Sequence, residues 1–299
     1  MAARDLRIVD PHVHFWDLSR ARYAWLQDDP LPNNPAGDMS PIAHRNYLPS
    51  DYRRDVGDWR VEKIVHVECG LPRAEQVGET LWLEALADRE GFPTGLVVGA
   101  DMFDPELEAK LEAHAAQKRV RGVRQIVCWH ADPLKTYTPR DMLMDDAWWA
   151  GFAKLARHGL AFDLQLYPTQ MRDAARRLSN DPNIPVIVNH AGLPTDRDEA
   201  GLAIWRTGLR ALAELPWVSI KISGLGITHR TPEAARATIL RCIDIFGVTR
   251  AMFASDFPVD SVHASFDATY RAFDEATQHF SADERAALFA ENAEAIYKI

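Results

Sequence analysis

Residues 7–16 read Arg-Ile-Val-Asp-Pro-His-Val-His-Phe-Trp, and this stretch decides between two folds. Residues 7–13 form a short apolar run, which is typical of a buried β-strand. In an open doubly wound sheet, the first strand would be followed by a glycine-rich Gly-x-Gly-x-x-Gly turn that holds a dinucleotide. Histidines and aromatic residues occupy that position here. The stretch therefore argues against a doubly wound sheet and favours a closed barrel.

Further apolar runs alternate with amphipathic segments along the rest of the chain. The runs cover residues 62–69, 94–101, 122–128, 161–167, 184–190, 217–223 and 250–256. The clearest helical patterns cover residues 74–89, 105–117, 147–158, 169–179, 198–214, 231–246 and 281–297. Strands that alternate with helices indicate βαβ units and a parallel sheet. Eight strands in 299 residues predict a single-domain α/β protein, a (β/α)8 TIM barrel over residues 1–299.

One connection is much longer than the others. Residues 15–60 contain prolines at positions 30, 32, 35, 41 and 49 and the turn-like sequence Pro-Asn-Asn-Pro-Ala-Gly-Asp. A long connection in a compact domain is usually either functional or disordered. This one leaves the carboxyl end of the first strand, where the active sites of barrels lie. We expect it to form a pocket wall or a lid, with a surface excursion or a contact between subunits as the alternative.

The composition favours a small-molecule substrate over a nucleic acid or a membrane. The formal net charge is −9, and basic residues cluster only briefly, beside acidic helical sequence. A nucleic-acid binder needs a basic face to neutralise phosphates. No stretch approaches the ~18 uninterrupted apolar residues of a membrane-spanning helix. The three cysteines offer no disulfide framework and the first residues lack the apolar run of a signal peptide, so we expect a cytoplasmic protein, as a monomer or a homo-oligomer.

Histidine and aspartate stand at the carboxyl ends of three predicted strands. His12 and His14 are two residues apart on the first strand and therefore point to the same face. His190 ends an apolar run, and Asp256 ends the last one. Each group alone has a structural explanation, such as a cap or a satisfied histidine. Because the first and eighth strands of a barrel are neighbours, we expect the groups to meet at one mouth, where imidazole and carboxylate could bind Zn²⁺.

Other residues at strand ends are candidate substrate contacts. Arg124 could bind a carboxylate or a ring oxygen through two hydrogen bonds, or could form a structural ion pair. Glu68 could ligate a metal or orient His12 or His14. The remaining candidates for stacking or hydrogen bonding are Trp16, Trp129, His130, Gln165, Tyr167 and Ser223.

Over essentially its whole length, the chain resembles the amidohydrolase superfamily, and within it the branch of sugar and aromatic-acid lactonases with related decarboxylases. The resemblance rests on residues 9–16, 122–124, 162–163, 189–192 (Asn-His-Ala-Gly), 221–225 (Lys-Ile-Ser-Gly-Leu), 255–258 (Ser-Asp-Phe-Pro) and 291–293. It implies that His12, His14 and His190 ligate a metal or polarise the substrate. It also implies that Asp256 is the general base that takes a proton from the attacking water.

The chain departs from the members of the superfamily that hold two metals. Those members carry a bridging lysine or glutamate on the fourth strand and a further histidine on the fifth. The fourth strand here offers Arg124 and Gln125, and the fifth offers Asp163 and Gln165. We therefore expect at most one divalent cation, Zn²⁺, held by residues 12, 14, 190 and 256 or a subset of them, with metal-independent catalysis as the alternative.

The leading prediction is a hydrolase that opens a sugar-acid or muconate-type lactone, with Asp256 and His190 as the catalytic residues. The residues themselves do not distinguish a lactone from an amide, so the choice of a lactone comes from the resemblance. One alternative is a metal-dependent decarboxylase of an aromatic or muconate-like acid on the same fold. The other is a barrel that binds a ligand without turnover.

Overall fold

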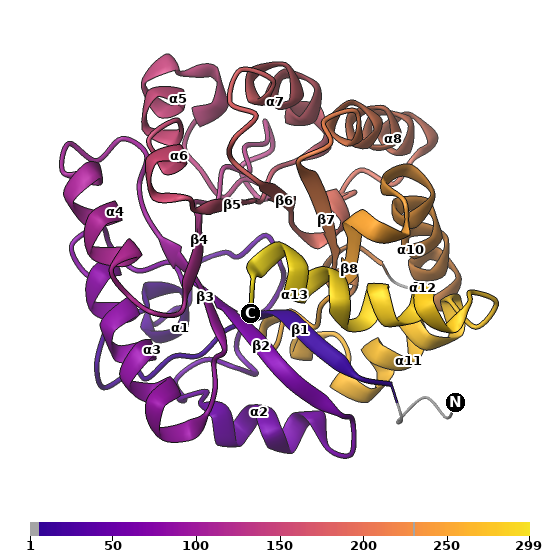
Figure 1. The fold of residues 1–299 in the computed structure, drawn as a ribbon, viewed down its shortest axis with the longest axis horizontal. Helices are drawn as coiled ribbons and strands as arrows, with labels where there is room; N and C mark the ends of the chain where they lie inside the picture. Colours follow the sequence, from indigo (N-terminus) through magenta and orange to yellow (C-terminus); the bar gives the residue numbers. More distant parts are fainter. Residues whose placement is uncertain (1–5, 230) are drawn as a thin grey trace.

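Eight parallel strands form one sheet in a computed structural model that describes residues 6–229 and 231–299. Their bounds are β1 Ile8–Val13, β2 Val61–Val67, β3 Gly95–Gly99, β4 Val120–Arg124, β5 Ala161–Leu164, β6 Val186–Val188, β7 Val218–Ile222 and β8 Ala251–Phe253. The strands are hydrogen-bonded in sequence order, and the helices surround them (Figure 1). The predicted single-domain (β/α)8 barrel is confirmed. Residues 1–5, on which the expectation about a signal peptide partly rests, lie outside the described residues.

The barrel closes at its mouth, between β1 and the segment that follows β8. The backbone N–H of His14 donates to the carbonyl oxygen of Phe257 at 2.8 Å. In the opposite direction, the N–H of Asp256 donates to the carbonyl oxygen of His12 at 2.9 Å. An isolated parallel bridge joins Val13 to Phe257. The backbone bonds that close the barrel therefore also hold two histidines and the aspartate side by side.

Most helices lie where the sequence pattern places them. These are α3 Gln76–Glu90, α4 Leu107–Ala115, α7 Met171–Leu178, α8 Glu199–Ala213 and α10 Pro232–Phe246. The helix expected over residues 147–158 is two short helices, α5 Asp146–Phe152 and α6 Leu155–His158. The closing segment is α12 Ala282–Ala286, a π-helical turn Ala287–Glu291 and α13 Asn292–Tyr297. Among the described residues, no helix combines the length and the apolar character that a bilayer crossing needs.

The sequence pattern did not indicate α1 Ala24–Gln27, α2 Pro49–Val56, α9 Leu225–Thr228 and α11 Phe266–Ala276. The first two lie in the long connection after β1, which is therefore not entirely a loop. The sequence did contain a signal for α11, because serine is a preferred residue at the start of a helix and Ser265 stands there. In the structure, its side chain accepts a hydrogen bond from the N–H of Ala268. Short 3₁₀ turns cover Met142–Met144, Pro168–Gln170, His190–Gly192, Val248–Arg250 and Val259–Val262.

The closing helix seals one end of the barrel. Tyr297, Ala290 and Ala293 pack against a cluster of inward-facing strand residues, which comprises Val9, Val65, Val67, Val97, Ala161, Ile187 and Met252. Lys63, near the start of β2, donates to the carbonyl oxygen of Ile299 at 2.8 Å. In Figure 1, α13 lies across the centre of the ring of strands. Because this helix covers the amino ends of the strands, the carboxyl ends are left for a site.

Candidate active site

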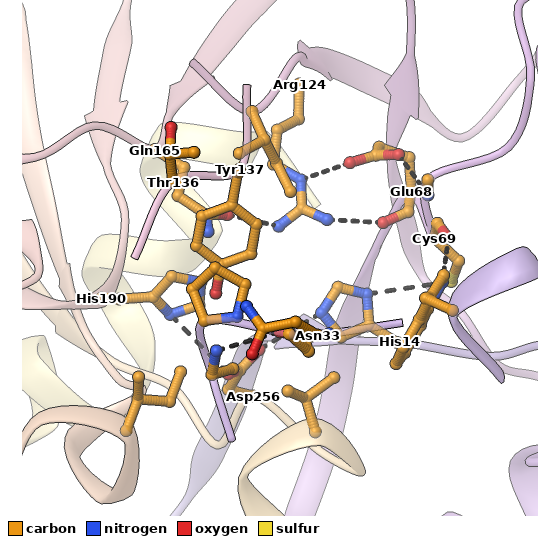
Figure 2. A pocket seen from close by; sticks show the side chains of 18 residues that line it. His14, Asn33, Glu68, Cys69, Arg124, Thr136, Tyr137, Gln165, His190 and Asp256 are labelled. Atoms are coloured by element: carbon orange, nitrogen blue, oxygen red, sulfur yellow. Dashed lines mark hydrogen bonds and ion pairs between the residues drawn. The ribbon is translucent and has the colours of Figure 1, made fainter. Parts of the chain in front are cut away.

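A cavity of about 280 Å³ opens at the carboxyl ends of the strands. Strand ends contribute His14, Glu68, Arg124, Gln165, His190 and Asp256 to its lining (Figure 2). The long connection after β1 contributes Trp25 and residues 33–36, and the loop after β4 contributes Thr136 and Tyr137. The connection over residues 15–60 thus supplies part of the pocket wall. The Asn-Asn pair of its turn sequence was visible in the sequence, but its direction toward the cavity was not.

The three histidines and the aspartate lie together at this cavity, and all of them except the fully buried His12 line it. His14 Nε2 lies 3.2 Å from Asp256 Oδ1, and His12 Nε2 lies 3.5 Å from the same oxygen. His190 Nδ1 lies 3.9 Å from Asp256 Oδ2. The ring centroids of His12 and His190 are 4.6 Å apart. All four side chains are buried, so the strand ends that carried these residues in the sequence do form one site.

Strained backbone turns His190 and Asp256 toward the cavity. His190 has φ 53° and Asp256 has φ 61°, in the left-handed region that non-glycine residues rarely adopt. Each such residue costs on the order of 1–3 kcal/mol and persists only where its surroundings hold it. Ser223, a secondary candidate in the sequence, contributes to this hold because its Oγ lies 3.0 Å from His190 Nδ1. Such strain is typical of functional positions.

The hydrogen bonds of His14 show which of its ring nitrogens carries the hydrogen and which has a lone pair directed at Asp256. His14 Nδ1 donates to the carbonyl oxygen of Val67 at 2.7 Å, since a carbonyl can only accept. The neutral ring then has a lone pair at Nε2, directed at Asp256 Oδ1. Two acceptors at this distance require a proton or a cation between them. The other oxygen of Asp256, Oδ2, is buried without a hydrogen-bond partner.

These residues fit one metal ion. Donor atoms of His12, His190 and Asp256 lie within 4.8 Å of one another, and His14 Nε2 faces the same carboxylate. Imidazole nitrogen and carboxylate oxygen are common zinc ligands. Neither Arg124 nor Asp163, at the strand positions considered for a second ion, is a free donor group, because each is held in an ion pair.

At neutral pH, Asp256 is a carboxylate and the buried rings of His12 and His190 are uncharged. Burial raises the pKa of Asp256, but His190, His14 and Arg124 lower it, and the net shift is downward from 3.8. Burial lowers the pKa of His190 to about 4. Burial, together with Lys221, also lowers the pKa of His12 well below 6.5. Asp256 is therefore able to accept a proton.

Arg124 lines the cavity with its charge already balanced. Its Nε donates to Glu68 Oε1 at 2.7 Å, and its Nη2 donates to the Glu68 carbonyl oxygen at 2.6 Å. Its Nη1 donates to Gln165 Oε1 at 3.0 Å. The structural ion pair considered for Arg124 is therefore present. The carboxylate of Glu68 contacts Arg124 and the N–H of Gly70, so it orients the guanidinium.

Five of the candidate substrate contacts do not line the cavity, namely Trp16, Trp129, His130, Tyr167 and Ser223. Trp16 has the same strand parity as His12 and His14, but its backbone pairs with Tyr47 and its fully buried ring packs in the core. The long connection thus removes Trp16 from the row of inward-facing side chains. His130 lies 3.5 Å from Asp196, outside the lining of the cavity.

A second cluster, formed by His66, Cys69 and Glu79, also has donor atoms within 4.8 Å of one another. The N–H of Phe15 donates to His66 Nδ1 at 3.1 Å, so the hydrogen of the neutral ring is on Nε2. That nitrogen cannot then offer a lone pair to a metal. Burial raises the pKa of Glu79 to about 8, which leaves its carboxyl largely uncharged at neutral pH. This cluster does not fit a cation.

The barrel and the site define an amidohydrolase. The family model described as Amidohydrolase (Amidohydro_2) matches residues 9–299, and the chain belongs to this family. It is 39% identical over 298 residues to an uncharacterized protein, y4mH, of Sinorhizobium fredii, with 99% of each chain covered. It is 29% identical to the L-fucono-1,5-lactonase of Burkholderia multivorans, over 97% of this chain and 96% of that protein. A crystal structure of an amidohydrolase from Burkholderia multivorans with bound zinc has a TM-score of 0.80 and 27% identity, and the match covers 98% of this chain and 99% of that chain.

Proposed function

We propose that this protein is a lactonase that hydrolyses the lactone of a sugar acid, a small and uncharged polyol ring. One observation carries the proposal: the carboxylate of Asp256 meets three imidazoles in a cavity whose single guanidinium is already paired with Glu68. The similarity to an L-fucono-1,5-lactonase supports the same class of substrate.

Asp256 acts as the general base in this proposal. It takes a proton from a water molecule while the water oxygen bonds to the lactone carbonyl carbon. The bond from that carbon to the ring oxygen then breaks, and the departing oxygen receives the proton from Asp256. The product is the open hydroxy acid.

The histidines bind and polarise the carbonyl end of the substrate. Ser223 and the strained turn hold the ring of His190 at the cavity wall, close to Asp256 Oδ2. A divalent cation bound by residues 12, 14, 190 and 256, or by a subset of them, would supply Lewis-acid polarisation of the carbonyl group.

The charge of the cavity favours a sugar-acid lactone over a muconate-type lactone. Among the eighteen residues that line the cavity, all of them described, Arg124 is the only arginine or lysine. Other polar groups at the wall, which could bond to sugar hydroxyls, are the neutral side chains of Asn33, Asn34, Thr136, Tyr137 and Gln165. A substrate that carries its own carboxylate would need a cationic side chain in the pocket as its partner. The only such side chain in the lining, Arg124, is already paired with Glu68. The same argument opposes a decarboxylase of aromatic acids.

A substrate panel tests the proposal. The protein is incubated with three classes of compound, each with and without added zinc. These are aldonolactones (among them L-fucono-1,5-lactone), a muconolactone, and an aromatic hydroxy acid. Acid production and carbon dioxide release are measured in parallel. We expect acid from aldonolactones at rates that exceed the spontaneous reaction. Carbon dioxide release from the aromatic acid, or a preference for the muconolactone, would overturn the proposal.

A further inference from the structure

The two hydroxyl side chains that line the cavity, Thr136 and Tyr137, differ in what they offer a ligand. Thr136 Oγ1 donates its hydrogen to the carbonyl oxygen of Thr138 at 2.8 Å and accepts from the N–H of His130 at 3.1 Å. The hydroxyl of Tyr137 has no hydrogen bond to any described residue. Because a phenol is both a donor and an acceptor, both functions of this group are free for a ligand.

The three amide side chains of the lining are each partly used within the protein. Asn33 Nδ2 donates to the carbonyl oxygen of Leu134 at 3.2 Å. Asn34 Oδ1 accepts from a backbone N–H two residues later at 2.9 Å. Gln165 Oε1 accepts from Arg124 Nη1 at 3.0 Å. Among the neutral polar groups of the lining, all of them on described residues, only the phenol is therefore wholly free.

The protein holds Tyr137 in place although it lies in a loop. Its backbone N–H donates to the carbonyl oxygen of Cys128 at 3.0 Å. The hydroxyl of Tyr167 donates to the carbonyl oxygen of Lys135 and so fixes the preceding part of the same loop. The ring of Tyr137 packs against a cluster of Cys128, Tyr167 and Leu193, and its centroid lies 6.4 Å from that of Tyr167. A group positioned before the ligand arrives loses little freedom on binding.

Tyr137 belongs to the part of the cavity wall that loops supply. The groups proposed for the chemistry, His14, His190 and Asp256, stand at strand ends, whereas Tyr137 projects over the cavity from the loop after β4 (Figure 2). In this fold the strand ends supply the chemistry, and the loops vary to suit different substrates. This position therefore suits a hydroxyl group of the substrate ring better than its carbonyl group.

We propose that Tyr137 is a specificity-determining residue that forms a hydrogen bond with a hydroxyl group on the lactone ring. The inference rests on the proposed function, since it names the part of the polyol lactone that this side chain recognises. A site built to bond to a substrate hydroxyl group rejects an analogue that lacks it, because the polar group of the protein is then left without a partner. The protein should thus favour a hydroxylated lactone over a plain one of the same ring size.

Binding of uncleaved analogues tests this contact without turnover. The first probe is the 1,5-lactam of L-fuconic acid, whose amide bond resists hydrolysis. The second is 2-piperidone, the same six-membered ring without hydroxyl groups. Dissociation constants are measured by NMR titration of the protein. We expect Tyr137→Phe to weaken binding of the polyol lactam about three- to tenfold, and to change binding of 2-piperidone by less than about twofold.

The variant should fold normally, because phenylalanine keeps the ring and the lost hydroxyl has no partner in the described structure. The matched control is Tyr47→Phe, which removes a hydroxyl that bonds to Asp55 at 2.8 Å outside the cavity lining. It should leave both dissociation constants unchanged. Three results would overturn the proposal: unchanged affinity of Tyr137→Phe for the polyol lactam, an equal loss for both lactams, or no binding of the polyol lactam to the wild type.

Kinetics separate a bound ring hydroxyl from the reacting oxygens. With an aldonolactone as substrate, Tyr137→Phe should raise KM about three- to tenfold and leave kcat within about twofold, because the lost contact is equal in the ground state and the transition state. A fall in kcat at unchanged KM would place the phenol on a reacting oxygen and refute the proposal. If the wild type does not hydrolyse lactones, the proposed function fails, but the lactam dissociation constants still decide the role of Tyr137.

Discussion

The chemistry of this site depends on one carboxylate that stays ionised although it is buried. The rings of His12 and His14 face the same oxygen of Asp256, and the other oxygen, 3.9 Å from His190 Nδ1, has no hydrogen-bond partner among the described residues. A buried carboxylate ordinarily prefers its protonated form. Here the neighbouring histidines and Arg124 reverse that preference and lower its pKa. The result is a base that is ready at neutral pH.

Asp256→Asn should reduce turnover of the active lactone by about 10²–10⁴ while the protein remains folded. The amide has nearly the same shape but cannot accept the proton of water. Initial rates and circular dichroism of the purified variant check this. Asp244→Asn, at an exposed ion pair on α10, is the control and should keep wild-type rates. Near-normal turnover in Asp256→Asn would remove Asp256 from the role of base.

The pH dependence follows from the direction of these shifts. Asp256 has a lowered pKa, so its ionised form, and the stability that ionisation contributes, persist above that pKa and are lost as the pH falls through it. His190 has a pKa of about 4, so its ring is neutral from about pH 5 upward and gains a proton as the pH falls through 4. We expect kcat/KM to be nearly flat from about pH 5.5 to 7.5 and to fall near pH 4. An acid limb with its midpoint above pH 6, measured in a pH-stat, would contradict this assignment.

At the scale of elements, the turn after β7 supports the strained turn after β6. Gly224 has φ +61°, and a Cβ atom built there would lie 2.9 Å from His190 Nδ1. Glycine is therefore needed both for its backbone conformation and for the space that the imidazole occupies. Sequence periodicity does not reveal the positive φ of Gly224 or its contact with His190, because the two residues follow different strands and meet only in the folded barrel.

Gly224→Ala should impair turnover by displacing His190. Gly159→Ala is the matched control, since Gly159 has nearly the same left-handed backbone, with φ +63°, but a Cβ there would meet nothing within 4 Å. Both variants should lose about 1–2 kcal/mol of unfolding free energy from backbone strain. Only Gly224→Ala should also lose activity, by tenfold or more. Urea unfolding and initial rates separate the two effects, and equal activity in both variants would show that the contact is unimportant.

At the scale of the whole molecule, the last helix connects the stability of the barrel to its site. Tyr297 packs under the inward-facing strand residues, and its hydroxyl donates to Asp163, the partner of Lys221. The end of the chain therefore reaches the layer directly beneath His12.

Tyr297→Ala should lower the unfolding free energy by about 3–5 kcal/mol, because it leaves a cavity in the barrel interior. Tyr297→Phe keeps the ring and loses only the hydrogen bond to a buried carboxylate, so we expect about 1–3 kcal/mol. Denaturant titration measures both values. A similar loss in both variants would mean that the hydrogen bond, and not the packing, dominates.

The metal content is a property of the complete barrel mouth. We expect at most one tightly held zinc per chain by elemental analysis of protein purified without chelator, since Arg124 and Asp163 are held in ion pairs. His14→Gln should lower that content. Two equivalents per chain would disprove the single-ion site.

The sequence by itself determined the barrel, its strand order and the strand ends that carry His12, His14, His190 and Asp256. This was possible because strand and helix periodicity are local properties, and because a parallel barrel gathers the carboxyl ends of its strands at one mouth. Helix α11 was missed, although its Ser265 cap was in the sequence.

Only the tertiary structure decided which polar groups are free and which are already paired. Arg124 bonds to Glu68, which is 56 positions away, and Lys221 faces His12 from a distance of 209 positions. Likewise, the pairing of Trp16 with Tyr47 removed a residue of the correct strand parity from the pocket. Contacts between residues so far apart exist only after the barrel has closed. The sequence alone therefore does not show which groups the guanidinium of Arg124, the ammonium of Lys221 or the indole of Trp16 will contact.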